Sequence, residues 1–278
     1  MIDLTDNHYS LTEAKRQELF DACVDNDAHS KSSMRMITLD GGDARSDLGR
    51  STEQQVFDKA FGSVVPHTPE LMTREYGDYE EQSTFFVVLD TDTQDAIASL
   101  RIIRGHPNKT TSDLLRDGLV SSVSLGDLGL DKENVWDIAT AAVVPSRSAS
   151  KMRQASTALY RALYWSSMSS GVTYWTSVID RRVLRLYDHL GIPFQRLPGT
   201  SDLDYLGSPA QACIARVQDV EHSMRSRAES SNKSTQQRIE AIIGSNGLSS
   251  LAPEGDLVID LTGSDMTEAS TISQQQNT

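Results

Sequence analysis

Residues 135–144 read VWDIATAAVV, residues 151–170 read KMRQASTALYRALYWSSMSS and residues 172–179 read VTYWTSVI. The first and third segments are apolar and rich in β-branched residues, which is typical of strands. In the middle segment, apolar residues recur at spacings of three and four, which predicts a helix. A strand, a helix and a second strand over this length form a βαβ unit, so we expect the two strands to be parallel.

The segments on either side of this unit complete a mixed sheet. Ser10 and Glu13 stand in capping-box spacing at the start of a predicted helix over 10–25. Residues 84–89 and 96–104 predict an antiparallel hairpin around an acidic turn. We therefore expect one α/β (α+β) domain with a mixed central sheet flanked by helices. The remaining predicted elements are helices at 51–61 and 181–190, a strand at 210–217 and an irregular segment at 64–79.

The composition changes near the C-terminus. From about residue 229 the residues Ser, Gln, Asn and Thr dominate, and the chain ends in QQQNT at 274–278. Such a composition buries too little apolar surface to offset the entropy lost on folding. We expect residues 1–228 to form the folded domain and residues 229–278 to form a low-complexity, mostly disordered tail, with one short helix at 235–242.

Charge and cysteine content exclude several classes of function. The 278 residues carry a formal net charge of −13, which argues against a nucleic-acid-binding surface and against docking on anionic lipid. Cys23 and Cys213 form neither a metal-binding spacing nor a disulfide framework. The sequence shows no signal peptide and no apolar stretch long enough to span a membrane. We expect a soluble, cytoplasmic protein of bacterial type.

Several segments resemble one enzyme superfamily. Residues 184–194 read LRLYDHLGIPF, a helix-then-strand segment in which a Tyr precedes a Leu-Gly-aromatic ending. This segment and the order of the elements resemble the acyl-CoA N-acyltransferase (GNAT-like) superfamily. Within it, the plan is nearest to the acyl-homoserine-lactone synthases and the long-chain N-acyl amino acid synthases. The likeness covers about residues 48–200, including RSTEQQVF at 50–57, EYGDYE at 75–80, SLRI at 99–102 and WDI at 136–138.

This resemblance implies that residues 1–228 are an acyltransferase domain. It implies transfer of an acyl group from acyl-CoA, or from an acyl-carrier protein, to a small-molecule amine that attacks directly, without a metal. The sequence departs from the family at two places. Residues 146–156 lack the glycines of acetyltransferases, and the Glu-x-x-Arg of the lactone synthases is replaced by Asp137 to Thr140. The alternative function is a non-catalytic GNAT-like module that binds a ligand or a partner.

The donor site implied by the resemblance lies at the turn into the helix after the central strand. Free backbone N–H groups at a helix N-terminus can bind a pyrophosphate, and Arg147, Lys151 and Arg153 would add positive charge. The alternative is an ordinary solvated surface loop. The full set of expected cofactor-binding residues is Ala142, Val143, Val144, Arg147, Ser148, Lys151, Arg153, Gln154, Ala155 and Ser156.

In this fold the central strand and the next one part, and the pantetheine arm of the donor lies between them like an added strand. Small side chains such as Ala141 and Ala142 would let the ligand approach the backbone. A backbone N–H near Val143 would then polarise the thioester carbonyl. The alternative is that two alanines of a buried strand simply face a large neighbour.

Two residues are candidates for acid–base chemistry. Tyr187 could donate a proton to the leaving thiolate, although its spacing from Leu184 and Leu190 also suits a core tyrosine. Asp137 lies in an apolar strand, where an unpaired carboxylate is costly, so it is either a base in an open cavity or the partner of a cation such as Arg101. The expected substrate-binding residues are Asp78, Arg101, Trp136 and Trp175, for which a solvated loop and core packing are the alternatives.

Overall fold

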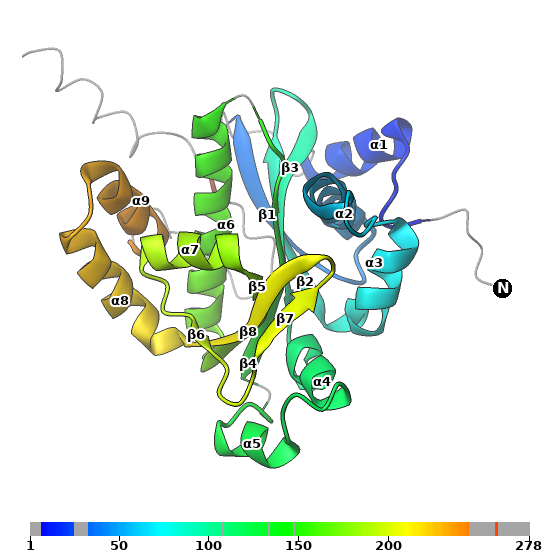
Figure 1. Ribbon diagram of the computed structural model, residues 1–278. Coiled ribbons are helices and arrows are strands. Elements are labelled where there is room, and N and C mark those ends of the chain that lie inside the picture. The colour runs from blue at the N-terminus through cyan, green and yellow to red at the C-terminus, as the bar shows by residue number, and fades with distance from the viewer. Residues whose placement is uncertain are drawn as a thin grey trace, which may run out of the picture.

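The computed structural model describes residues 7–24, 33–106, 108–132, 134–146, 148–244 and 259–260 (Figure 1). Its strands form a sheet in the order β6, β8, β5, β4, β3, β2, β1, β9, with β7 also paired to β8. The strands are β1 (Met34–Asp40), β2 (Ser83–Asp90), β3 (Asp95–Ile103), β4 (Val135–Val143), β5 (Tyr174–Asp180), β6 (Gln195–Arg196), β7 (Asp202–Tyr205), β8 (Ser208–Arg216) and β9 (Ile259–Asp260).

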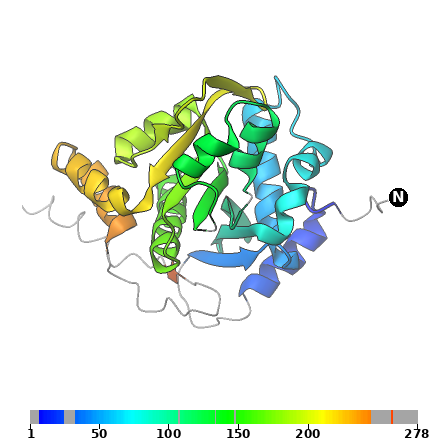
Figure 2. The same cartoon turned by 90° about the horizontal axis from the view of Figure 1, so that it is seen from below.

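Helices cover both faces of this sheet, as the mixed fold class predicts. Helices α6, α8 and α9 lie on one face, and α1, α2 and α3 lie on the other (Figure 1). Helices α4 and α5 lie below the sheet in Figure 1 and in front of it in Figure 2. The α-helices are α1 (Glu13–Val24), α2 (Asp47–Phe61), α3 (Pro69–Tyr76), α4 (Lys109–Arg116), α5 (Ser122–Asp127), α6 (Ala149–Ser169), α7 (Arg181–Leu190), α8 (Val217–Glu229) and α9 (Lys233–Ile243), and short 3-10 helices span Ala44–Ser46 and Gly77–Gln82.

The central βαβ unit and the hairpin have the predicted directions. Strands β2 and β3 pair antiparallel, and β4 and β5 pair parallel across α6. One segment differs from the expectation, because residues 64–79 contain α3 rather than only irregular chain. Thr68 accepts a hydrogen bond from the Leu71 N–H as its N-cap, and Pro69 stands at the first turn, where its missing N–H costs nothing.

Strands β4 and β5 separate soon after they meet. Their pairing holds only from Val135 with Tyr174 to Asp137 with Thr176, although β4 continues to Val143 and β5 to Asp180. Just past the last pair, Ala139 is an extra residue against β3, since Arg101 pairs with Thr140 and Ile102 with Ile138. A bulge bends its strand and increases its twist, which accounts for the divergence of β4 from β5. The predicted parting of these strands is therefore present.

A helix lies within the segment predicted as a low-complexity tail, residues 229–278. The helix expected at 235–242 is present as α9, and its Ile239, Ile242 and Ile243 are buried in the main apolar cluster beside α6 and α8. Arg238 donates hydrogen bonds to Ser156 and Thr157 of α6. The polar composition of this segment conceals the packing of α9, because a few apolar residues at helical spacing suffice to dock a short helix. Residues 245–258 and 261–278 of the predicted tail lie outside the described residues.

Every helix in the described part of the chain is too short or too polar to cross a membrane.

Replacing Ile242 by Ala tests the docking of α9. Its side chain is 1% exposed, so we expect the free energy of unfolding to fall by about 2–5 kcal/mol, which denaturant titration would measure. Gln237→Ala, at an exposed position of the same helix, is the matched control and should change the value by less than about 0.5 kcal/mol. Equal effects of the two substitutions would show that α9 does not pack as described.

Candidate active site

A cavity of about 270 Å³ lies where β4 and β5 part. Four consecutive residues of each strand line it, 138–141 of β4 and 177–180 of β5. Because successive side chains of a strand point to opposite faces, such runs mean that the facing edges of the two strands form the walls. The Ser177 hydroxyl donates to the Ile138 carbonyl at 2.6 Å, next to the last strand pair. The volume is close to the lower end of small-molecule sites, about 300–1,000 Å³.

Elements on both sides of the parted strands complete the cavity wall. Helix α2 contributes Phe57 and Ala60, the segment before α3 contributes His67, and α7 contributes Tyr187. Tyr76 and Tyr205 form another wall and hydrogen-bond to each other. The lining is therefore mostly apolar and aromatic with a few polar groups, as is usual for sites that bind organic ligands.

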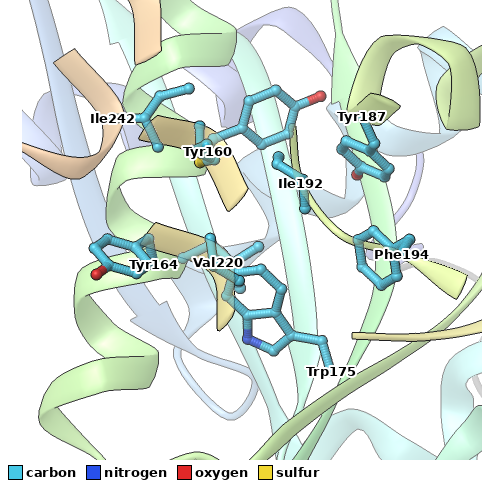
Figure 3. Close-up of a pocket in the computed structure, with 10 residues that line it drawn as sticks. Tyr160, Tyr164, Trp175, Tyr187, Ile192, Phe194, Val220 and Ile242 are labelled. Atoms are coloured by element: carbon cyan, nitrogen blue, oxygen red, sulfur yellow. The ribbon is translucent and has the colours of Figure 1, made fainter. Parts of the chain in front are cut away.

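Tyr187, the candidate general acid, lines the cavity. It is hydrogen-bonded to Tyr160, and its ring centroid lies 5.1 Å from that of Phe194. Burial raises the pKa of Tyr187 well above its usual value, so the phenol stays protonated at neutral pH. Tyr187 also borders a second void of about 10 Å³, walled by Tyr160, Trp175, Phe194 and other apolar residues (Figure 3). This second void holds about one water-sized probe, so it is too small for a ligand.

Asp137 does not line the cavity. It belongs to the paired part of β4 and is 1% exposed. Its carboxylate accepts hydrogen bonds from the Thr110 N–H at 2.6 Å and the Thr110 hydroxyl at 2.8 Å, in the first turn of α4. Burial raises the pKa of Asp137 to about 6, against the opposing effect of these two hydrogen bonds. Its partner is thus a helix N-terminus, and the Arg101 pairing considered from the sequence is not formed.

Two of the expected donor-binding cations, at the start of α6, are bound by other side chains. Lys151 is paired with Asp90 at 2.8 Å and Asp92 at 3.2 Å, both from the acidic turn of the hairpin. Arg153 donates to the Ser234 hydroxyl of α9, and Arg147 lies outside the described residues. Ser148 accepts from the Lys151 N–H and caps the helix.

The other expected donor-binding residues are divided between core and surface. Of the small residues of β4, Ala141 lines the cavity, whereas Ala142 is buried away from it. Val143 packs against the main apolar cluster, and the Val144 N–H continues the pairing with β3 by donating to Ile97. In α6, Ala155 is in the core, Gln154 is half-buried and Ser156 accepts from Arg238.

Three of the four expected substrate-binding residues lie in the interior of the protein. Arg101 is fully buried in a charged cluster, where it donates to Glu53 at 2.9 Å and to the Tyr9 hydroxyl at 2.8 Å. Glu53 also accepts from the hydroxyl of Thr140, the residue that stands where the lactone synthases would have arginine. Asp78 is exposed, and Trp136 and Trp175 lie in the core, with the Trp175 indole N–H donating to Ser167.

Sequence reasoning missed four residues of this region: Glu53, His67, Tyr76 and Tyr205. Glu53 has a readable signal, since an acidic residue follows Ser51 and Thr52 on the buried side of a helix. The other three lie in or next to loops and reach the cavity only through tertiary packing. The described residues contain no group of three or more His, Cys, Asp or Glu side chains placed to hold a metal ion.

No protein-family model matches this sequence, and no curated protein matches it either. Solved structures do match. TofI in a ternary complex with an inhibitor and MTA superposes with a TM-score of 0.51 and 13% identity, over 68% of this chain and 96% of that one. The AHL synthase LasI superposes with a TM-score of 0.48 and 15% identity, over 77% of this chain and 96% of that one. FeeM, an N-acyl amino acid synthase from uncultured soil microbes, superposes with a TM-score of 0.47 and 13% identity, over 68% of this chain and 95% of that one.

At these identities the likeness concerns the fold. The chain has a fold similar to that of TofI, and the mixed, helix-flanked sheet predicted from the sequence is confirmed. The particular structures it resembles are TofI, LasI and FeeM.

The buried carboxyl of Asp137 predicts a specific pH dependence of stability. Its folded-state pKa of about 6 lies above the unfolded value of 3.8, so the native state binds more protons between about pH 4 and 6. Stability from this group is therefore greatest at low pH and is lost as the pH rises through 6. The difference in unfolding free energy between the wild type and Asp137→Asn should shrink or reverse over this range in urea titrations.

The matched control for this comparison is Asp78→Asn, at an exposed position. A difference between wild type and Asp137→Asn that stays constant from pH 4 to 6 would contradict the raised pKa of the carboxyl.

Proposed function

We propose that the protein is an N-acyltransferase in which an amine attacks an acyl thioester held between β4 and β5. One observation carries this proposal: the two parallel strands pair over only three residues each and then leave a cavity of about 270 Å³. Past Asp137 and Thr176 the facing edges of β4 and β5 are not paired with each other, and residues of both strands line the open space between them. An extended ligand with amide groups can pair with such edges as an added strand does.

The pantetheine arm of coenzyme A or of an acyl-carrier protein has this character. It is a narrow chain with two amides, and its thioester end would lie among the apolar and aromatic walls of the cavity. Small side chains at Ala139 and Ala141 leave room for it beside β4. The exclusion of water from such a site strengthens each hydrogen bond to the reacting carbonyl.

Tyr187 supports the chemistry of the leaving group. Its phenol stays protonated because burial raises its pKa, and it borders the same cavity. A thiolate is a weaker base than a tyrosinate, so outright transfer of the phenol proton is unfavourable. Transfer becomes feasible when the nitrogen of the new amide returns a proton to the phenol as the sulfur takes one. Tyr187 would then act as a relay between nitrogen and sulfur.

A second candidate is a non-catalytic GNAT-like module that binds a ligand or a partner. The observation that favours it is the pairing of Lys151 with Asp90 and Asp92, which removes a free cation from the expected phosphate site. A ligand without phosphates would fit this arrangement equally well. The two candidates differ in whether an acyl donor is turned over.

Thermal stabilisation across coenzyme A, acetyl-CoA, a long-chain acyl-CoA and S-adenosylmethionine tests donor binding. At a hundredfold excess over Kd, a ligand that binds the native state adds about 2.7 kcal/mol and raises Tm by about 5–10 °C. We expect this shift with coenzyme A and its thioesters. Ala60→Trp, at an exposed position on the cavity wall, should reduce the shift.

Gln55→Trp is the matched control, because it is an exposed position of α2 that is not part of the cavity wall. The donor assignment fails if no coenzyme A compound shifts Tm, or if the two tryptophan variants respond alike. Binding without turnover of any acyl donor would favour the non-catalytic module.

The relay role of Tyr187 predicts a selective kinetic effect. Tyr187→Phe should lower kcat for acyl transfer by about a hundredfold and leave KM for the donor within a few fold, since the ring still packs against Phe194. Tyr160→Phe also breaks the Tyr160–Tyr187 hydrogen bond but does not touch the open cavity, so it should cost less than tenfold. Similar losses in the two variants would assign a packing role to the pair.

A further inference from the structure

His67 is fixed in place by both of its peptide groups. Its N–H donates to the Asp58 carboxylate at 3.0 Å, and its C=O accepts from the Gln54 side-chain amide at 2.8 Å. Both partners belong to α2, and the next residue, Thr68, caps α3. These bonds hold the backbone at His67, and the packing of its ring against Phe57 and Phe61 restricts the side chain.

His67 lines the cavity between β4 and β5. It is 1% exposed, and its ring centroid lies 5.9 Å from those of Phe57 and Phe61. Tyr187 borders the same cavity from the opposite flank, on α7. The site therefore has a histidine and a tyrosine as titratable groups on two separate walls.

The hydrogen bonds of the ring are incomplete. A neutral imidazole offers one N–H and one lone pair. The Val65 carbonyl is the acceptor beside the ring, and Nδ1 is buried without a partner of normal hydrogen-bond geometry. Among the described residues, no N–H or O–H group donates to either ring nitrogen. An unsatisfied buried polar group costs about 1–3 kcal/mol, so the protein itself does not fully satisfy this ring.

The charges around the ring are compatible with a neutral imidazole. Burial lowers the pKa of His67, while the Val65 carbonyl and the Asp58 carboxylate act in the opposite direction. The other titratable groups on the cavity wall are already engaged. Asp180 accepts from the Arg182 N–H and the Ser208 hydroxyl, and the three tyrosines are engaged as Tyr76 with Tyr205 and Tyr187 with Tyr160.

We propose that His67 is the general base of the reaction and takes a proton from the ammonium form of the amine acceptor. This inference rests on the proposed acyl transfer, and it assigns to His67 the role that the sequence suggested for Asp137. Asp137 is excluded from the role by its position, since both of its carboxylate oxygens are bound by Thr110 in the paired part of β4.

The proposed reaction begins at the ammonium group of the acceptor. An N–H bond of the ammonium breaks, and its proton moves to the imidazole, which becomes an imidazolium. The freed lone pair of the amine attacks the thioester carbon, so that a C–N bond forms and the C–S bond breaks. The new amide nitrogen loses one further proton, which reaches the departing sulfur through the Tyr187 hydroxyl. The products are an amide and a thiol, and the imidazolium returns its proton to water.

The experiment compares His67→Gln and His67→Ala with the wild type, using an acyl-CoA and a panel of the twenty amino acids and simple primary amines. We expect kcat/KM at pH 7 to fall about a hundredfold or more, with the Tm shift by coenzyme A retained. The wild-type rate should decline at low pH as the imidazole is protonated, and this limb should be absent from both variants. Imidazole added to the buffer should restore part of the activity of His67→Ala.

The matched control is His106→Gln, which replaces an exposed histidine and should keep the wild-type rate and pH profile. Turnover that is unchanged in both His67 variants would overturn the assignment of the base but leave the acyltransferase intact. A wild type without turnover of any acyl donor would overturn both.

A readout independent of turnover is the nitrogen-15 spectrum of labelled protein. It should show the His67 ring with one protonated and one bare nitrogen at pH 7, and a doubly protonated ring would overturn the assignment.

Discussion

The interruption of pairing between β4 and β5 is the constraint on which the rest of the structure depends. A buried peptide group that loses its partner costs free energy comparable to a lost hydrogen bond, so neighbouring strands normally stay paired. Here β4 bends at the bulge at Ala139, and the Ser177 hydroxyl satisfies the Ile138 carbonyl at the point of separation. Beyond this point the strand edges face an open space that a ligand with its own amide groups can fill.

On its other side, β4 stays paired with the rest of the sheet. Strand β3 pairs with β4 along most of its length, and a buried ionic cluster braces this pair against α2. Arg101 of β3 and Thr140 of β4 both bind Glu53 of α2, so a single carboxylate ties three elements together. Buried charges are costly unless they are paired, and the pairing of Arg101 with Glu53 holds β3 and β4 against α2 while β5 departs.

The fold could be predicted from the sequence because its elements have strong periodic signals. The apolar strands, the long helix between them and the hairpin leave few ways to arrange the chain, and the strand–helix–strand unit sets the parallel pair. The segment after β5 singled out Tyr187, and its acid–base role stays a prediction. Helix α9 was partly concealed by a polar composition, although its three isoleucines stand on one side.

The site was harder to predict, because it depends on contacts between distant segments. The sequence shows that Asp137 is in β4, but not that pairing with β5 ends at that residue and the cavity begins at the next. From the sequence, Lys151 is a candidate phosphate ligand. The fold brings Asp90 and Asp92, which are 61 and 59 residues away in the chain, into contact with it. The sequence around His67 shows only the neighbouring Pro66 and Pro69, which do not predict a site residue. His67 is a candidate because hydrogen bonds to α2 hold it beside the cavity.

The most direct measurement is a crystal structure of the protein grown with coenzyme A. Our account predicts that the pantetheine lies between residues 138–141 of β4 and 177–180 of β5, with its sulfur near Tyr187. Coenzyme A bound elsewhere on the molecule, with β4 and β5 closed on each other, would contradict it.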